Sequence, residues 1–452
     1  MSATRPTPQK PFLFSSRFSP KIAPAVSRLS ESNTFRAFRS SKYTLYFTGR
    51  SVSQLGTWMQ RTAVVWVVYS MTNSAFLIGA TIFAEQFPSF LFSIPGGVAA
   101  DRYDRHKIIM LMQILSIIQS VLMAVMVLTH HTTVWAIIVL SVLLGIINAF
   151  DVPARQTLVH EVVTDHADLP SAIAMTTAMA NLAQLLGPVL SGIVLSVFGA
   201  AVCFFVNAAS FGGVMLSLIL MKLPPSPPRK NEKNVLVEFA DGFRYLRRSP
   251  NISMMILLLA LTSLLVLPYN TVLPVFAKVI FKGNASTFGL INGFIGAGAV
   301  AGTVYLASRK PGAPLKKILF AGTFILGVGM ILFSQTRYFP VAMFFAILTG
   351  FGSMAQYTVS NIVAQSESAP EMRGRVIGIM LMALFGMMPI GSLVVGAVSQ
   401  RIGAPTTMLV QGIIAIVLAL AFSRFLFSRT VVPVTNDISI AEVEEMEQEK
   451  YL

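Results

Sequence analysis

The sequence has little charge, few acidic residues and almost no cysteine. Only 12% of its 452 residues are charged, with 34 lysines and arginines against 19 aspartates and glutamates. Soluble domains carry about 25% charged residues, so this composition excludes an ordinary soluble protein. The one cysteine, Cys203, lies in an apolar run, which excludes an internal disulfide and suits a small packing residue.

Several chemical motifs are also absent. The chain has no phosphate-binding loop of the Walker type, so nothing supports direct drive by ATP. Its five histidines show no spacing of a known metal site, and no nucleophile, base and third group cluster along the sequence. We therefore expect no enzyme, no metal and no cofactor.

Long apolar runs take the place of these motifs. The chain is 54% hydrophobic with a mean hydropathy of +0.70, and its runs are near the roughly 20 residues that cross a bilayer. The pattern predicts an all-α membrane protein with twelve transmembrane helices embedded in the lipid bilayer. The predicted spans are residues 45–69, 76–98, 108–128, 134–150, 172–198, 201–220, 252–277, 288–307, 318–334, 340–363, 376–399 and 406–427.

The basic residues indicate the topology. Most of the 34 lysines and arginines lie in the tails and in the loops on the side of the N-terminus, whereas the opposite loops and helix ends hold Lys278, Lys282, Arg337 and Arg401. Basic residues gather in cytoplasmic loops, so both termini are expected in the cytoplasm. The net charge of +15 is thereby explained as topology, and we expect no binding of nucleic acid.

The chain divides into five predicted parts. They are a basic N-terminal tail (1–42), a six-helix half (43–221), a linker with an amphipathic helix (222–250), a second six-helix half (251–428) and an acidic tail (429–452). Similar stretches, Phe35-Arg-Ala-Phe-Arg and Phe243-Arg-Tyr-Leu-Arg, precede the two halves and favour a parallel repeat. The first 30 residues fit either a disordered cytoplasmic tail or a cleaved transit peptide, which would place the protein in an organelle membrane.

One polar stretch lies between two membrane-length runs. It reads Gly96-Gly-Val-Ala-Ala-Asp-Arg-Tyr-Asp-Arg-His-Lys107. This stretch resembles the short cytoplasmic loop between the second and third helices of the major facilitator superfamily, at Gly97, Asp101, Arg102, Arg105 and Lys107. The sequence departs from that pattern at Asp104, where most of the superfamily has glycine.

Four further stretches, 56–61, 148–156, 168–173 and 373–376, resemble one branch of exporters, which includes the enterobactin exporter and macrolide efflux proteins. The resemblance implies the major facilitator fold and a secondary active transporter in a bacterial inner membrane. Such a protein would export small amphipathic molecules, drug-like or siderophore-like, by alternating access, in exchange for protons, as a monomer. Two alternatives stay open: a lysophospholipid flippase, and a sensor or scaffold that transports nothing.

Two ionisable residues within the spans are candidates for proton coupling. Arg61 and Glu85 each lie about 12–14 Å below the outer end of their helices, so they can meet. Burial favours a neutral carboxyl group, whereas a neighbouring cation favours its ionised form. Glu85 would carry the proton and Arg61 would tune it. The alternative is a permanent ion pair that fixes the packing of two helices.

A cytoplasmic gate is the second predicted element. In it Asp151 and Arg155 would join Asp101 and Arg105 in a latch, because surface ion pairs are cheap to break and remake. The predicted gate residues are Gly97, Asp101, Arg102, Arg105, Asp151, Arg155, Arg373 and Arg375.

Polar and aromatic residues within the spans could line a substrate cavity. Arg50 could instead extend to the membrane surface, and each polar residue could instead form a hydrogen bond between helices. The predicted cavity residues are Arg50, Trp58, Gln113, Asn148, Asn181, Gln184, Asn270, Asn292 and Gln356.

Overall fold

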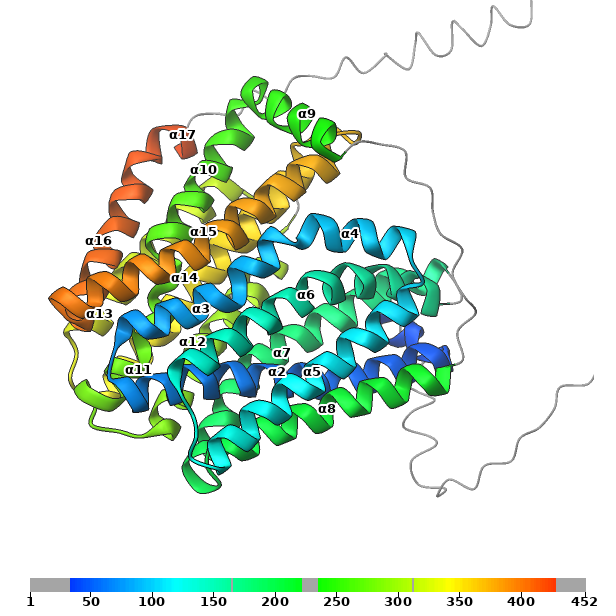
Figure 1. The fold of residues 1–452 in the computed structure, drawn as a ribbon. Coiled ribbons are helices and arrows are strands. Elements are labelled where there is room, and N and C mark those ends of the chain that lie inside the picture. The colour runs from blue at the N-terminus through cyan, green and yellow to red at the C-terminus, as the bar shows by residue number, and fades with distance from the viewer. Residues whose placement is uncertain (1–32, 164–165, 222–234, 311–312, 428–452) are drawn as a thin grey trace, which may run out of the picture.

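The computed structural model describes residues 33–163, 166–221, 235–310 and 313–427, and in these ranges it contains helices and no strand (Figure 1). The predictions for the basic N-terminal residues and the acidic C-terminal tail lie outside the described residues. The first part of the chain forms η1 (Asn33–Arg39), α2 (Ser41–Thr72), α3 (Ala75–Leu91), α4 (Ser93–Arg102), α5 (Arg105–Leu128), α6 (Val134–Val162), η2 (His166–Asp168), α7 (Leu169–Val197) and α8 (Ala200–Met221). The second part forms α9 (Val235–Arg248), α10 (Pro250–Leu265), η3 (Leu267–Thr271), α11 (Leu273–Val275), η4 (Phe276–Ile280), α12 (Ala285–Ala307), α13 (Leu315–Gln335), α14 (Phe339–Ser366), α15 (Arg373–Ile402), α16 (Ala404–Ala421) and α17 (Ser423–Phe427).

The helices agree with the predicted membrane spans. Ten of those described are long and apolar enough to cross a bilayer, and the bent pair α3 and α4 makes eleven. The remaining long helix, α2, has 32 residues but is interrupted by polar side chains such as Gln60 and Arg61. The all-helical membrane fold is therefore confirmed, and the count reaches twelve only when α2 is included by its length.

Prolines break two of the spans. Pro88 lies near the end of α3, and α4 leaves it at an angle of 46°. A proline removes one hydrogen bond of the helix and its ring clashes with the preceding turn, which accounts for the bend. Pro268 and Pro274 likewise divide the span from Pro250 to Ile280 into α10, η3, α11 and η4.

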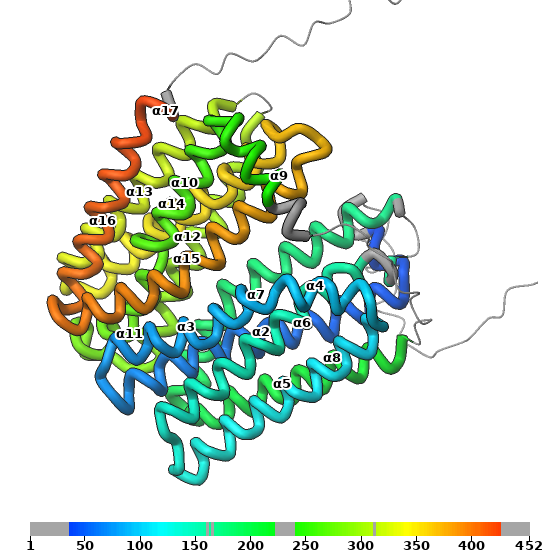
Figure 2. Tube along the Cα trace, turned by 45° about the horizontal axis from the view of Figure 1, so that its top comes forward, coloured from blue at the N-terminus to red at the C-terminus, as the bar shows by residue number. Residues whose placement is uncertain are grey.

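The helices pack in two groups, which we call the N group (α2–α8) and the C group (α10–α16). The amphipathic helix α9, predicted from the linker sequence, packs on α15 of the C group. Figure 2 shows that the two groups lie side by side and diverge toward the end where α9 lies. We call that end of the molecule the linker side and the opposite end the far side.

The two groups meet on the far side. There the Lys278 ammonium donates to Asn73 Oδ1 at 2.9 Å, and the backbone N–H of Ala75 donates to Gln400 Oε1 at 3.1 Å. Glycines allow the backbones to touch: a Cβ on Gly289 of α12 would lie 2.6 Å from the carbonyl oxygen of Pro188 on α7. Hydrogen bonds between the groups, among the residues that the structure describes, all lie on this side.

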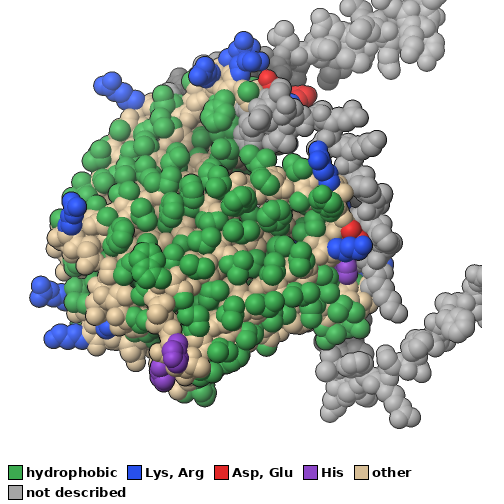
Figure 3. All heavy atoms as spheres, viewed as in Figure 1, with side chains coloured by type: hydrophobic (Ala, Val, Ile, Leu, Met, Phe, Trp, Pro, Cys, Tyr) green, Lys and Arg blue, Asp and Glu red, His purple; other side chains and the backbone are tan. Residues whose placement is uncertain are grey.

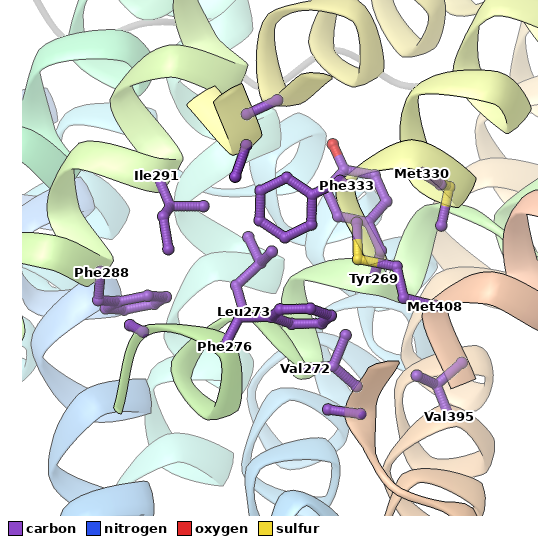
Figure 4. Close-up of a cluster of buried hydrophobic side chains, with 14 of the residues drawn as sticks. Tyr269, Val272, Leu273, Phe276, Phe288, Ile291, Met330, Phe333, Val395 and Met408 are labelled. Carbon is purple, nitrogen blue, oxygen red and sulfur yellow. The ribbon is translucent and has the colours of Figure 1, made fainter. Parts of the chain in front are cut away.

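The C group contains a cluster of aromatic side chains on the far side. Phe276 packs edge-on against Phe333 with ring centroids 5.0 Å apart, and Leu273 and Tyr269 are buried beside them (Figure 4). The face seen in Figure 3 is covered with hydrophobic side chains, and the charged residues visible on it lie toward its edges. This distribution matches a protein surrounded by lipid tails.

Candidate functional site

One face of α2 is directed toward the space between the two groups. Its residues Arg50, Gln54, Trp58, Arg61 and Val65 follow one another at intervals of three or four, which places them on one side of a helix. At the far end of this face Val65 packs against the core cluster of the C group. We call these five residues the α2 stripe. All five residues are half-buried, and in the middle of the stripe Trp58 lies against Gly187 of α7.

Arg61 and Glu85 form an ion pair midway along this stripe. Arg61 Nε donates to Glu85 Oε1 at 2.7 Å, as the similar predicted depths of the two residues allow. The Arg61 guanidinium also lies 5.3 Å from the ring centroid of Trp58. The Arg61 side chain is 36% exposed and that of Glu85 only 13%, so the pair reaches the space between the groups through the arginine.

A second ion pair is enclosed in the N group. Arg155 Nε lies 2.5 Å from Asp151 Oδ2, one turn earlier on α6, and the amide of Gln113 donates to Asp151 Oδ1 at 3.2 Å. All three residues are buried. Both oxygens of Asp151 are thus bound inside one group.

The predicted gate residues divide among separate partners. Asp104 caps the start of α5 by accepting from the His106 N–H at 2.9 Å. Arg105 is buried and its Nε donates to the carbonyl oxygen of Ala100 at 3.1 Å, whereas Asp101 is half-buried and Arg102 is exposed. In this conformation Asp151 binds Arg155 and Gln113. The latch that would join Asp151 and Arg155 to this loop stays a prediction.

Of the two neighbouring glycines in this loop, Gly96 and not the predicted Gly97 lies at a close helix contact. Gly96 lies against the backbone of Ala149 on α6, where a Cβ would collide with the carbonyl oxygen. A Cβ on Gly97 would meet nothing within 4 Å. Close approach of α4 and α6 therefore depends on Gly96 in this conformation.

On the C group, Arg375 holds the linker helix. Its Nη1 lies 3.6 Å from Asp241 Oδ2 on α9, and a Cβ on Gly242 would lie 2.9 Å from Ile379. The hydroxyl of Tyr245 accepts from the Ala369 N–H at 3.1 Å. Arg373 is exposed. Among the described residues, the ion-pair partner of Arg375 thus lies on α9.

Some of the predicted cavity residues are buried in helix packing, and others are partly exposed. Gln113 and Gln356 are corrected: both are buried in helix packing, and Gln356 Nε2 donates to Thr262 Oγ1 at 2.7 Å. Asn292 donates to the Phe288 carbonyl of its own helix at 2.9 Å. Trp58, Asn148, Asn181 and Asn270 are half-buried, and Gln184 is exposed.

Arg50 lines a small pocket between α2 and α7, with a volume of about 60 Å³. The pocket is lined by Tyr46, Phe47, Arg50, Ser51, Gln54, Thr176, Met179 and Ala180. Two members of the α2 stripe therefore open into a cavity, on the linker-side half of the helix.

A buried polar network was missed by sequence reasoning. Gln60 donates to Gln119 Oε1 at 2.9 Å and accepts from Asn207 at 2.8 Å and from Ser120 at 2.8 Å. These contacts join α2, α5 and α8 in the middle of the N group. The only signal in the sequence was the presence of amide side chains within apolar spans, which does not tell which of them meet.

Comparison with known proteins decides the family. The family described as "Transmembrane secretion effector", of the major facilitator superfamily, matches residues 32–450. The chain belongs to this family. Its members are transporters, so the protein is a multi-pass membrane transporter of small molecules and not an enzyme.

The relatives agree with the predicted exporter branch. The transporter is 24% identical to the staphyloferrin A transporter of Staphylococcus aureus, over 83% of this chain and 94% of that protein. It is 23% identical to the multidrug efflux pump Tap of Mycolicibacterium fortuitum, over 79% and 90%. It is 28% identical to the enterobactin exporter EntS of Salmonella typhimurium, over 78% and 83%.

A solved structure confirms the fold. The crystal structure of a bacterial homolog of the human lysosomal transporter Spinster, in an inward-facing and unoccupied conformation, superposes with a TM-score of 0.67. That structure is 15% identical, over 85% of the transporter and 97% of its own chain. The likeness extends through both helix groups.

Proposed function

We propose that the transporter exports small amphipathic organic molecules from the cytoplasm by alternating access, in exchange for protons. The linker side faces the cytoplasm, so the described conformation is open inward. The relatives, a siderophore transporter, a siderophore exporter and a drug pump, support this substrate class. Rocking of the two groups about the far-side contacts would expose the α2 stripe to the other side.

The observation that carries the proposal is the Arg61–Glu85 pair on the α2 stripe. A 2.7 Å contact within the membrane joins the Glu85 carboxylate to the Arg61 guanidinium, and the exposed part of Arg61 connects the pair to the space between the groups. Protonation of Glu85 would remove its charge and weaken its hold on Arg61. The pair therefore has two charge states that differ in what they offer a substrate, as proton exchange requires.

The test is transport in vesicles of known orientation with an imposed pH gradient and a panel of fluorescent amphipathic dyes. The wild type is expected to accumulate dye against its gradient, whereas Glu85→Gln exchanges dye without responding to pH. Glu367→Gln, which removes an exposed carboxylate at the end of α14, is the matched control and should behave as wild type. Gradient-driven accumulation by Glu85→Gln would refute proton coupling at this residue, and flux of lipid without dye would favour the flippase.

A further inference from the structure

The polar groups that line the pocket at Arg50 divide into groups that can donate hydrogen bonds and groups that can only accept them. The Ser51 hydroxyl already donates to the Phe47 carbonyl at 2.7 Å, and the Thr176 hydroxyl donates to the Ala172 carbonyl at 2.8 Å. The guanidinium of Arg50, the amide of Gln54 and the hydroxyl of Tyr46 can donate into the cavity, whereas the Ser51 and Thr176 oxygens can only accept. Arg50 is the charged group of this lining, so the set favours a negatively charged ligand that accepts hydrogen bonds.

Arg50 also lacks a counter-ion in the described parts of the chain. No carboxylate of those residues lies within ion-pair distance of it. Asp151, the acidic residue within electrostatic range, is already bound by Arg155 and Gln113. Glu85 is likewise bound by Arg61. The charges near the α2 stripe therefore leave one uncompensated positive charge, and a membrane-embedded cation without a partner is costly enough to suggest a ligand.

The size of the pocket limits what it can hold. A water molecule needs about 10–15 Å³ of cavity measured in this way, so about 60 Å³ accommodates a compact group such as a carboxylate. The rest of a substrate would have to lie outside, along the α2 stripe toward Trp58. The rings of Tyr46 and Phe47 and the thioether of Met179 give the pocket an apolar wall.

We propose that Arg50, with Gln54, forms an anion subsite that binds a carboxylate of the exported molecule. The planar guanidinium can hold both carboxylate oxygens, and the apolar body of the substrate then reaches toward the Arg61–Glu85 pair. The subsite selects amphipathic acids over their neutral or cationic analogues. This inference rests on the proposed export function and specifies its substrate class.

The test compares fluorescein with fluorescein methyl ester, two dyes that share one aromatic body and differ by one carboxylate. Binding to the purified transporter is measured by fluorescence polarisation, and flux is measured in vesicles with a pH gradient. The wild type should bind the acid about tenfold more tightly than the ester, because a charge-assisted hydrogen bond is lost with the carboxylate. Arg50→Gln should abolish that preference while binding of the ester stays within about twofold.

Two further variants separate the subsite from simpler explanations. Arg50→Lys keeps the charge but not the planar fork and should retain part of the preference. Lys317→Gln removes an exposed positive charge at the start of α13 and should retain all of it. The subsite is refuted if the wild type binds both dyes equally, or if Arg50→Gln weakens both to the same extent. Preferential binding of the acid without any flux would instead preserve the subsite and refute export.

Discussion

Two arginine–carboxylate pairs among the described residues of α2, α3 and α6 have the same chemistry and different surroundings. Asp151 and Arg155 are both buried, lie on one helix and are joined by Gln113. Arg61 and Glu85 belong to two helices, and more than a third of the Arg61 side chain is exposed toward the space between the groups. A pair that is buried on all sides can only stabilise the fold. A pair that faces the space between the groups can also respond when the shape of that space changes during transport.

The largest expected effect comes from breaking the enclosed pair. Asp151→Asn leaves Arg155 buried without a counter-ion, so the free energy of unfolding should fall by about 3–5 kcal/mol. Thermal unfolding in detergent measures this loss. The double variant Asp151→Leu with Arg155→Leu removes both charges and should recover most of it. An Asp151→Asn protein as stable as the wild type would show that the pair is not closed from water.

A smaller loss is expected when the third member of the enclosed unit is removed. Gln113→Leu deletes the donor to Asp151 Oδ1 and leaves that oxygen without this partner, which should cost about 1–3 kcal/mol of stability. Gln365→Leu on the exposed face of α14 is the control and should change stability by no more than about 0.5 kcal/mol. Thermal unfolding of the two proteins side by side decides the matter. Equal stability would mean that water replaces the amide.

The open pair should respond in transport more than in stability. Glu85→Asp keeps a carboxyl group that can take up a proton. Its side chain is one methylene shorter, so the carboxyl group lies farther from Arg61 Nε than the 2.7 Å of the wild type. We expect gradient-driven dye flux to fall about tenfold, because misplacement of a coupled group by about 1 Å is costly. Its loss of unfolding free energy should remain below that of Asp151→Asn. The opposite ranking, with normal flux and a large loss of stability, would make this pair structural as well.

The sequence predicts one of these pairs better than the other. Arg61 and Glu85 lie on consecutive antiparallel spans, so counting residues from the outer ends placed them at one level, and they meet there. Asp151 and Arg155 were assigned to a latch with the loop, although their spacing of four residues already allowed a pair on α6. What the spacing could not show is the direction in which the two side chains point within the packed N group.

The same limit applies to the polar amides and the loop glycines. The positions of the spans followed from hydropathy, but the polarity of α2 made it the weakest of them. Gln113 and Gln356 have the same residue type as Gln54, and only the packed structure separates buried helix contacts from a pocket lining. Likewise Gly96 and Gly97 are equivalent in sequence, and the bend after α3 decides which of them touches α6.

The smallest expected effect distinguishes charge from shape at the open pair. Arg61→Lys keeps the positive charge beside Glu85 but loses the planar group that lies 5.3 Å from the Trp58 ring. We expect gradient-driven flux to fall about threefold, since a cation–π contact contributes about 0.5–1 kcal/mol at a partly exposed site. Trp58→Phe, which keeps a weaker aromatic face, should produce a similar decrease, and the two changes together should add little further. The opposite result would be that Arg61→Lys abolishes flux while Trp58→Phe has no effect. Coupling would then depend on the geometry of the guanidinium against Glu85 and not on its position over the Trp58 ring. The open pair would in that case tolerate a change of side-chain shape as poorly as the enclosed pair.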